Sequence, residues 1–169
     1  MQIAVKLAFE EQAMVRLLNW LAQENAIILR QNAGLPLLYD SGVVYRREKR
    51  ETWCDYLNML IQGHEDCDGL AAARAGELMS KGWRALRQGD GGWEDAVRLR
   101  PNRIFSEVML RTSSGPDGGG LYHCLVHYRV NGRWYRDDPS ARLGMNGRIP
   151  PETRARWAQS IGSRAWRTQ

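Results

Sequence analysis

The chain has 169 residues, enough for one domain with a buried core and too few for two of ordinary size. Hydrophobic residues make up 43% and charged residues 25%, which excludes a wholly disordered chain. The formal charge of +5 is concentrated at the end, because residues 151–169 hold four arginines against one glutamate and so contribute a net +3. We therefore expect a single domain over residues 1–150 and a basic, tryptophan-containing tail over residues 151–169.

Targeting signals and disulfides are both unexpected. No apolar run approaches the roughly 18 residues that a bilayer span needs. Glu10 and Glu11 fall where a signal peptide would need an apolar block, so neither membrane insertion nor secretion through such a peptide is expected. The three cysteines, Cys54, Cys67 and Cys124, cannot all pair, and no Cys-x-x-Cys motif occurs.

The N-terminal part, residues 1–33, predicts a strand followed by a helix. Residues 1–8 alternate weakly between apolar and polar and suit a short edge strand. Apolar residues then recur at helical spacing over residues 9–31, which predicts an amphipathic helix, either continuous or broken near Asn25. Gly34 favours its end.

The middle of the chain predicts two further helices. Residues 35–45 are too apolar for a loose linker and suit an ordered connector, with a charged turn at residues 46–50. Apolar positions over residues 53–61 indicate a short helix. A small-residue helix follows over residues 67–81, and Gly82 is a suitable left-handed cap for its end.

The last third predicts strands. A Gly- and Ser-rich surface loop is expected at residues 113–120. Asn131-Gly132 is the strongest hairpin signal in the sequence. The strands are expected at residues 95–100, 104–112, 121–130 and 133–138.

Cys67 is the first candidate functional residue. It follows Asp66, a good N-cap, so it is expected at the first position of its helix. Free backbone N–H groups and the positive end of the helix dipole favour a thiolate there. The alternative is that Cys67 is an inert small residue of the core.

The hairpin predicts a partner pair for this cysteine. With a two-residue turn, Val130 pairs with Arg133, and His123 and Asp138 become diagonal neighbours on one face of the ribbon. Asp137 then points to the other face, whereas a three-residue turn would reverse the choice. A histidine oriented by a carboxylate can act as the base of a cysteine nucleophile. The alternatives for His123 are a core histidine bonded to backbone and a surface strand residue.

Three motifs occur in a fixed order: Asp66-Cys67-Asp68-x-Leu70 opening a helix, Tyr122-His123 opening a strand, and Asp138-Pro139-Ser140 after a hairpin. Further matching segments are Leu38-Tyr39-x-Ser41-Gly42-Val43-x-Tyr45-Arg46, Arg74-Ala75-x-Glu77-Leu78 and Leu143-Gly144-Met145. Together, over roughly residues 28–146, they resemble the transglutaminase-like branch of the papain-like fold. Within that branch they look like the small transglutaminase-like proteins encoded among tailed-phage and prophage structural genes.

This resemblance implies an α+β fold in which a central cysteine-bearing helix packs on an antiparallel sheet of about four strands, with the N-terminal helix alongside. It implies Cys67 as nucleophile, His123 as base and Asp138 as the residue that orients it. The family's upstream oxyanion-stabilising residue has no clear counterpart, and Trp53 and Gln62 are the candidates for that role.

The resemblance also implies a phage-associated cysteine amidohydrolase or transamidase, with a thioester intermediate and no cofactor. Its substrate would be a protein or peptide amide, and hydrolysis is favoured over cross-linking. The protein would act in the host cytoplasm, in the virion, or in both. The alternative is a catalytically silent structural protein of the head, neck or tail that binds other phage subunits. In either case the tail over residues 151–169 is a candidate for weak nucleic-acid contact.

A zinc site is a further alternative. His64, Cys67, His123, Cys124 and His127 are residue types that bind zinc. Against such a site, His123 and Cys124 are adjacent on a strand and should point to opposite faces, and His64 precedes the helix that contains Cys67. No metal is therefore expected.

Overall fold

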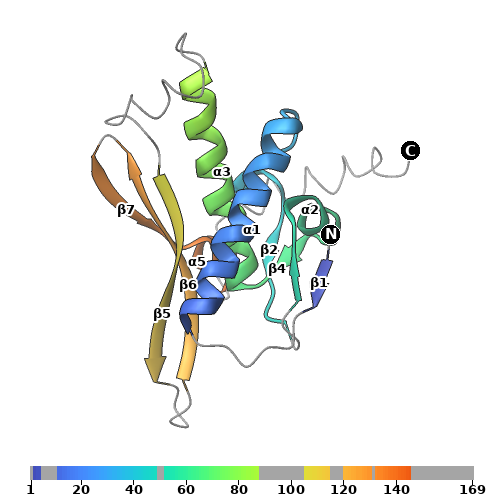
Figure 1. Ribbon diagram of the computed structural model, residues 1–169. Helices are drawn as coiled ribbons and strands as arrows, with labels where there is room; N and C mark the ends of the chain where they lie inside the picture. The colour runs from blue at the N-terminus through green and yellow to red at the C-terminus, as the bar shows by residue number, and fades with distance from the viewer. Residues whose placement is uncertain are drawn as a thin grey trace.

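The structure is a computed structural model that describes residues 2–4, 11–48, 52–87, 105–114, 120–130 and 132–145. It is an α+β fold in which two long helices, α1 (Glu11–Gln31) and α3 (Cys67–Arg87), lie side by side (Figure 1). The largest sheet lies against both helices, and its strands are β5 (Phe105–Ser114), β6 (Gly120–Val130) and β7 (Arg133–Asp137). The smaller elements gather on the other side of the helices (Figure 1). They are β1 (Gln2–Ala4), the 3-10 helix η1 (Leu38–Asp40), β2 (Val44–Tyr45), β3 (Thr52–Cys54), α2 (Tyr56–Gln62) and β4 (His64–Glu65). The short helix α5 (Pro139–Arg142) follows β7 and contacts α3 and β2.

The N-terminal helix agrees with the sequence prediction and runs unbroken through Asn25. The Asn25 side chain is buried, and its Oδ1 accepts a hydrogen bond of 2.8 Å from the backbone N–H of Tyr56. A polar residue inside the helix is thus explained by a bond that fixes the start of α2, and no break is needed.

Helix α3 is longer than its sequence signals predict. It continues through Gly82 to Arg87, so the predicted left-handed cap at residue 82 is wrong. Glycine in a helix interior costs only about 1 kcal/mol relative to alanine, and the next turn is rich in good helix formers. At Gly76 the helix meets α1 so closely that an added Cβ would lie 2.6 Å from the carbonyl oxygen of Ala22.

The segment before α3 contains a strand where a helix was expected. Trp53 lies in β3, which pairs antiparallel with β1, and α2 begins only after Asp55. Asp55 is the N-cap of α2, because its side chain accepts from the N–H of Asn58 at 3.0 Å. The predicted edge strand is confirmed at β1. The connector at residues 35–45 is ordered, and it ends in β2, which pairs in parallel with β4.

The hairpin register is the one that the sequence predicted. The strands are in the order β5-β6-β7, all antiparallel, with Val130 opposite Arg133 and Val126 opposite Asp137. Gly132 in the turn has φ +79°, a conformation that favours glycine. The strand predicted at residues 95–100 and the tail over residues 151–169 lie outside the described residues.

Helix α3 lies between two hydrophobic clusters. The first, toward the large sheet, consists of Leu18, Leu21, Ala22, Ala71, Ala72, Ala75, Leu78, Val108, Cys124 and Val126. The second, toward the smaller elements, consists of Leu29, Leu38, Val43, Cys54, Tyr56, Met59, Leu60, Leu70, Ala73 and Leu143. Because α3 is apolar on both sides, its first turn is held by packing from two directions. No helix in the described part of the chain has the length and apolar character needed to cross a bilayer.

Candidate active site

The candidate site is centred on Cys67, the first residue of α3. The preceding strand β4 leads directly into the helix, and the carbonyl of Asp66 accepts from the N–H of Leu70 at 3.1 Å. Cys67 is half-buried and packs against the cluster on the sheet side. The backbone N–H groups of the first helical turn point toward this end, where they stabilise negative charge.

Helix α3, which Cys67 opens, packs against β6. Partners on β7 extend along β6 only from Val130 to Val126, so the segment at His123 and Cys124 lies beyond that pairing. There the Cys67 thiol lies within interaction range of His123 and Cys124, the two residues whose groups lower its pKa. Side chains from opposite faces of a strand can both reach an atom that sits at the strand's edge. The sequence interpretation assumed that His123 and Cys124, on opposite faces of the strand, could not act at one site. Both nevertheless interact with Cys67.

Asp138 holds the other side of the imidazole. Its Oδ2 lies 2.9 Å from Nε2 of His123, which leaves Nδ1 as the nitrogen available to the thiol. Its Oδ1 accepts from the N–H of Ala141 at 3.0 Å, so the same carboxylate is the N-cap of α5. Both oxygens are engaged, and the imidazole is oriented by a group that is itself fixed.

Asp137, the neighbouring aspartate, has a structural role. It is buried, and its Oδ2 accepts from Nε of Arg74 at 2.8 Å, while Arg142 approaches its Oδ1 at 3.2 Å. Arg74 also pairs with the buried Glu77, so this ion network joins β7 to α3. The structure thus brings Asp138 to His123 and turns Asp137 away from it, as the two-residue turn required.

Hydrogen bonding governs the electrostatics of the site. The bond from the Cys124 thiol, followed by that from His123, lowers the pKa of Cys67 to about 4, against the opposing effect of burial. The bond with Cys67, followed by that with Asp138, raises the pKa of His123 to about 9. Between these two values the pair exists as a thiolate beside an imidazolium, the reactive form of a cysteine nucleophile.

The other two cysteines are shifted the opposite way. Contact with Cys67 and then burial raise the pKa of Cys124. Burial and the neighbouring Glu65 carboxylate raise the pKa of Cys54, whose Sγ lies 2.8 Å from Oε2 of Glu65. Cys67 is therefore the one thiolate expected at neutral pH.

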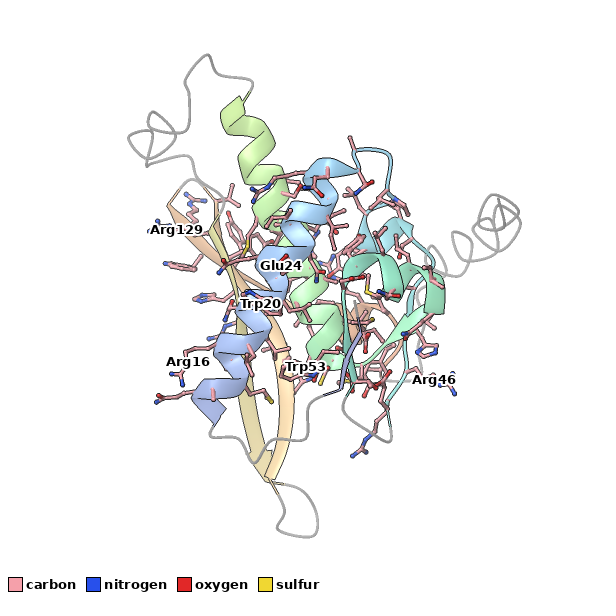
Figure 2. The ribbon with its side chains drawn as sticks, turned by 45° about the vertical axis from the view of Figure 1, so that its right-hand side comes forward. Arg16, Trp20, Glu24, Arg46, Trp53 and Arg129 are labelled. Atoms are coloured by element: carbon pink, nitrogen blue, oxygen red, sulfur yellow. The ribbon has the colours of Figure 1, made fainter. Side chains whose placement is uncertain are left out.

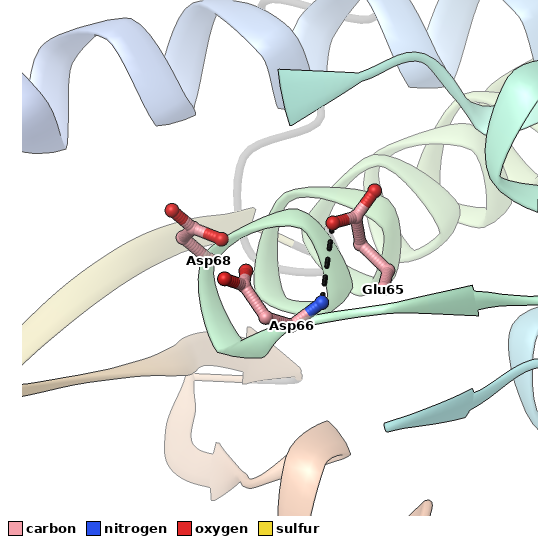
Figure 3. Close-up of side chains that lie close together, drawn as sticks. All are labelled: Glu65, Asp66 and Asp68. Atoms are coloured by element: carbon pink, nitrogen blue, oxygen red, sulfur yellow. Dashed lines mark hydrogen bonds between the residues drawn. The ribbon is translucent and has the colours of Figure 1, made fainter. Parts of the chain in front are cut away.

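Three carboxyl groups surround the start of α3 (Figure 3). Oxygens of Glu65, Asp66 and Asp68 lie within 4.8 Å of one another, and Oε1 of Glu65 accepts from the N–H of Asp66 at 3.1 Å. Burial and then a hydrogen bond with Asp66 raise the pKa of Asp68. Because two carboxyl groups that bond each other need a shared proton, the cluster is balanced in part by protonation.

The two candidates for oxyanion stabilisation differ in position. Trp53 lies beside the first turns of α3 (Figure 2), but its indole N–H donates to Oδ2 of Asp68 at 2.5 Å. Gln62 is the half-buried last residue of α2, before the left-handed Gly63. The sequence interpretation did not identify Tyr45 as a site residue. Its pKa is raised by burial and then by the negative charge of Cys67, which places its phenol within electrostatic reach of the thiolate.

The residues considered for zinc do not form one cluster. His64 Nε2 faces Arg46 at 3.3 Å, and His127 stacks on Trp134 with ring centroids 4.2 Å apart. Within the described residues, the acidic group at the start of α3 is the one set of three or more potential ligands whose ligand atoms all lie within 4.8 Å of one another. Carboxylate oxygens alone are not the ligand set that zinc prefers.

The chain matches no protein-family model, and neither the curated proteins nor the solved structures searched contain a match. The chemistry of the site therefore has to be judged from its own geometry.

Proposed function

We propose that the protein is a cysteine-nucleophile amidohydrolase or transamidase, with Cys67 as nucleophile, His123 as general acid and base, and Asp138 as the orienting carboxylate. One observation carries the proposal: His123, whose Nε2 is held 2.9 Å from the fixed Asp138 carboxylate, interacts with the half-buried Cys67 and lowers the pKa of its thiol. Cysteine-dependent acyl transfer needs this sequence of groups.

The reaction follows from the protonation states. The Cys67 thiolate attacks the amide carbonyl carbon, and the first-turn N–H groups of α3 stabilise the oxyanion that forms. The His123 imidazolium gives its proton to the departing amine, so the carbon–nitrogen bond breaks and a thioester remains. Water or a lysine amine then attacks the thioester, and His123 takes up its proton. The products are a carboxylic acid or a new amide, together with the regenerated thiolate–imidazolium pair.

The proposal extends to the fold type and the biological setting. A cysteine at the start of a central helix, a histidine on the adjacent antiparallel strand and an aspartate after the hairpin support a papain-like, transglutaminase-like type. By the same resemblance we propose a phage-associated protein, in the host cytoplasm or the virion, that acts on protein or peptide amides. Other phage structural subunits and, through residues 151–169, nucleic acid are proposed as contacts. A silent scaffold is the competing function, and the acyl-transfer experiment distinguishes the two.

The test is acylation by an activated ester, followed by mass spectrometry of the intact protein and of its peptides. We expect an acyl adduct on Cys67 that disappears with time, its absence in Cys67→Ala, and an unchanged adduct in the matched variant Cys54→Ala. Adding a primary amine separates the two second steps, because a transamidase forms the amide product and a hydrolase forms only the acid. Failure of the wild-type protein to acylate, with Cys67 still accessible to an alkylating reagent, would favour the silent scaffold.

A further inference from the structure

One face of the β6–β7 hairpin carries aromatic rings and arginines. Val126 of β6 packs toward the helices, as part of the cluster on the sheet side. Because side chains alternate along a strand, His127 and Arg129 lie on the opposite face, away from α1 and α3 (Figure 1). Arg136 is paired with the first and Trp134 with the second, so they share that face. We call these four residues the outer-face patch: His127, Arg129, Trp134 and Arg136.

The rings of the outer-face patch are held by contacts with one another. The imidazole of His127 stacks on the indole of Trp134, with ring centroids 4.2 Å apart and an interplanar angle of 22°. The guanidinium of Arg129 lies over the same indole, 5.5 Å from its centroid. Even with these contacts, 47% of the Trp134 surface is exposed. The patch therefore presents an aromatic ring that is fixed in place and open to a ligand.

The charge around this ring is positive. The segment from His127 to Arg136 contains three arginines and no aspartate or glutamate. On the neighbouring strand, Glu107 is the one acidic residue in register with it. Guanidinium groups stay charged at physiological pH and match the geometry of phosphate oxygens. The complementary partner is therefore an anion, and the indole adds a requirement for a flat ring.

We propose that the outer-face patch is a docking site for single-stranded nucleic acid, in which an unpaired base stacks on Trp134 and the phosphates pair with Arg129 and Arg136. Proteins bind single strands without reading their sequence by this combination of aromatic platforms and cations. A duplex offers only base edges in its grooves, and an acidic polypeptide offers charge without a base. The proposal does not depend on the acyl-transfer chemistry, and the patch is separate from residues 151–169.

The arginines flank the indole on two sides. Arg129 lies directly opposite Trp134 on the neighbouring strand, and Arg136 lies two residues further along β7, about 7 Å away. A base stacked on the indole therefore has one guanidinium across the hairpin and another along the strand. Both can reach the phosphates on either side of that base.

The test measures the affinity of the whole chain for a fluorescein-labelled oligothymidylate by fluorescence anisotropy, over a series of salt concentrations. Trp134→Ala should weaken binding about fivefold or more, whereas Trp134→Phe, which keeps a ring, should retain most of it. Arg129→Gln and Arg136→Gln should each reduce the slope of log affinity against log salt by about 0.7.

Helix α1 supplies matched controls. Trp20 is 42% exposed, and Arg16 is an exposed arginine one turn before it (Figure 2). Trp20→Ala and Arg16→Ala should leave both the affinity and its salt dependence unchanged. Thermal unfolding of each variant checks that it is folded, and the two arginine variants keep the test decisive where Trp134→Ala does not fold.

Unlabelled competitors identify what the patch recognises. An abasic strand of the same length has the same phosphates without rings, so it should compete about fivefold less well or worse. A duplex and polyglutamate should also compete poorly. Equal competition by the abasic strand or by polyglutamate would overturn the proposal, because charge alone would then explain the binding.

Two further results would count against the patch. The wild-type chain does not bind the single strand at all, or it binds with an affinity that Trp134→Ala and both arginine variants leave unchanged. The second result would place the contact elsewhere on the chain, as on residues 151–169. Neither result bears on acylation of Cys67, since the outer-face patch contains none of the three proposed catalytic residues.

Discussion

Alkylation of Cys67 should outpace that of an ordinary thiol in acid and fall behind it in alkali. The cause is the interaction with Cys124 and then that with His123, which together keep Cys67 ionised down to a pKa of about 4. A lowered pKa has two opposing effects, since it raises the thiolate fraction at low pH and lowers the intrinsic nucleophilicity of that thiolate.

The two effects can be compared in magnitude. At about pH 5 an ordinary cysteine is only about 0.03% thiolate, so a nearly fully ionised Cys67 has an advantage of about 3,000-fold in reactive form. A Brønsted coefficient of about 0.45 applied to a difference of about 4.5 pKa units reduces the intrinsic rate about 100-fold. Alkylation of Cys67 should therefore be about 30-fold faster than that of a free cysteine at pH 5, equal near about pH 6.5, and about 25-fold slower near pH 8.

The assay is iodoacetamide labelling of the native protein across this pH range, quantified by peptide mass spectrometry against a cysteine-containing peptide in the same tube. His123→Ala removes one of the two side chains that lower the pKa of Cys67. The rate advantage of Cys67 over the peptide at low pH should therefore shrink, and the midpoint of the pH dependence of its labelling should move to higher pH. His127→Ala is the matched control, because His127 lies further along the same strand and stacks on Trp134. Equal labelling of all three cysteines, or a midpoint unchanged by His123→Ala, would refute the reasoning.

Three further substitutions probe the surrounding frame, each measured by urea denaturation. Asp138→Ala removes the cap of α5 together with the carboxylate of the site, so we expect a loss of about 1 kcal/mol and slower alkylation of the nucleophile in acid; an unchanged alkylation profile would contradict the orienting role. Gly76→Ala places a Cβ 2.6 Å from a backbone oxygen of α1, and it should cost about 1–3 kcal/mol, whereas Gly34→Ala, which faces open space, should cost far less. Arg74→Met removes the cation shared by two buried carboxylates, which keep only Lys81 and Arg142 as partners, so we expect a loss smaller than the roughly 3–5 kcal/mol of a fully unpaired buried charge, and an unchanged midpoint of urea denaturation would count against the network.

The choice between two adjacent aspartates shows how much of the candidate site can be predicted from the sequence. A two-residue Asn-Gly turn fixes the pairing of Val130 with Arg133, and every later position follows because side chains alternate with period two. The side chains of Asp138 and Asp137 are therefore predicted on opposite faces of the hairpin. In the structure Asp138 pairs with His123, and Asp137 pairs with Arg74.

Local signals were less reliable where packing overrode them. Gly82 has the residue type of a helix cap, yet α3 continues past it. Trp53 fits the apolar pattern of a helix, yet it pairs as a strand with β1, because Asp55 sets the start of α2. Tertiary contacts easily outweigh a secondary-structure propensity of about 1 kcal/mol. Those contacts cannot be predicted from the local sequence.

The sequence by itself determined the start of the cysteine-bearing helix, the register of the hairpin and the aspartate that lies beside His123. Each of these depends on neighbours within a few residues or on strict alternation. Only the tertiary structure decided that Cys67 comes within interaction range of His123 and Cys124, on the part of β6 that extends beyond the end of β7. This arrangement depends on how far β6 extends past β7 and on how α3 is held between the two hydrophobic clusters. These distances are set by the packing of the whole chain, so no local pattern in the sequence encodes them.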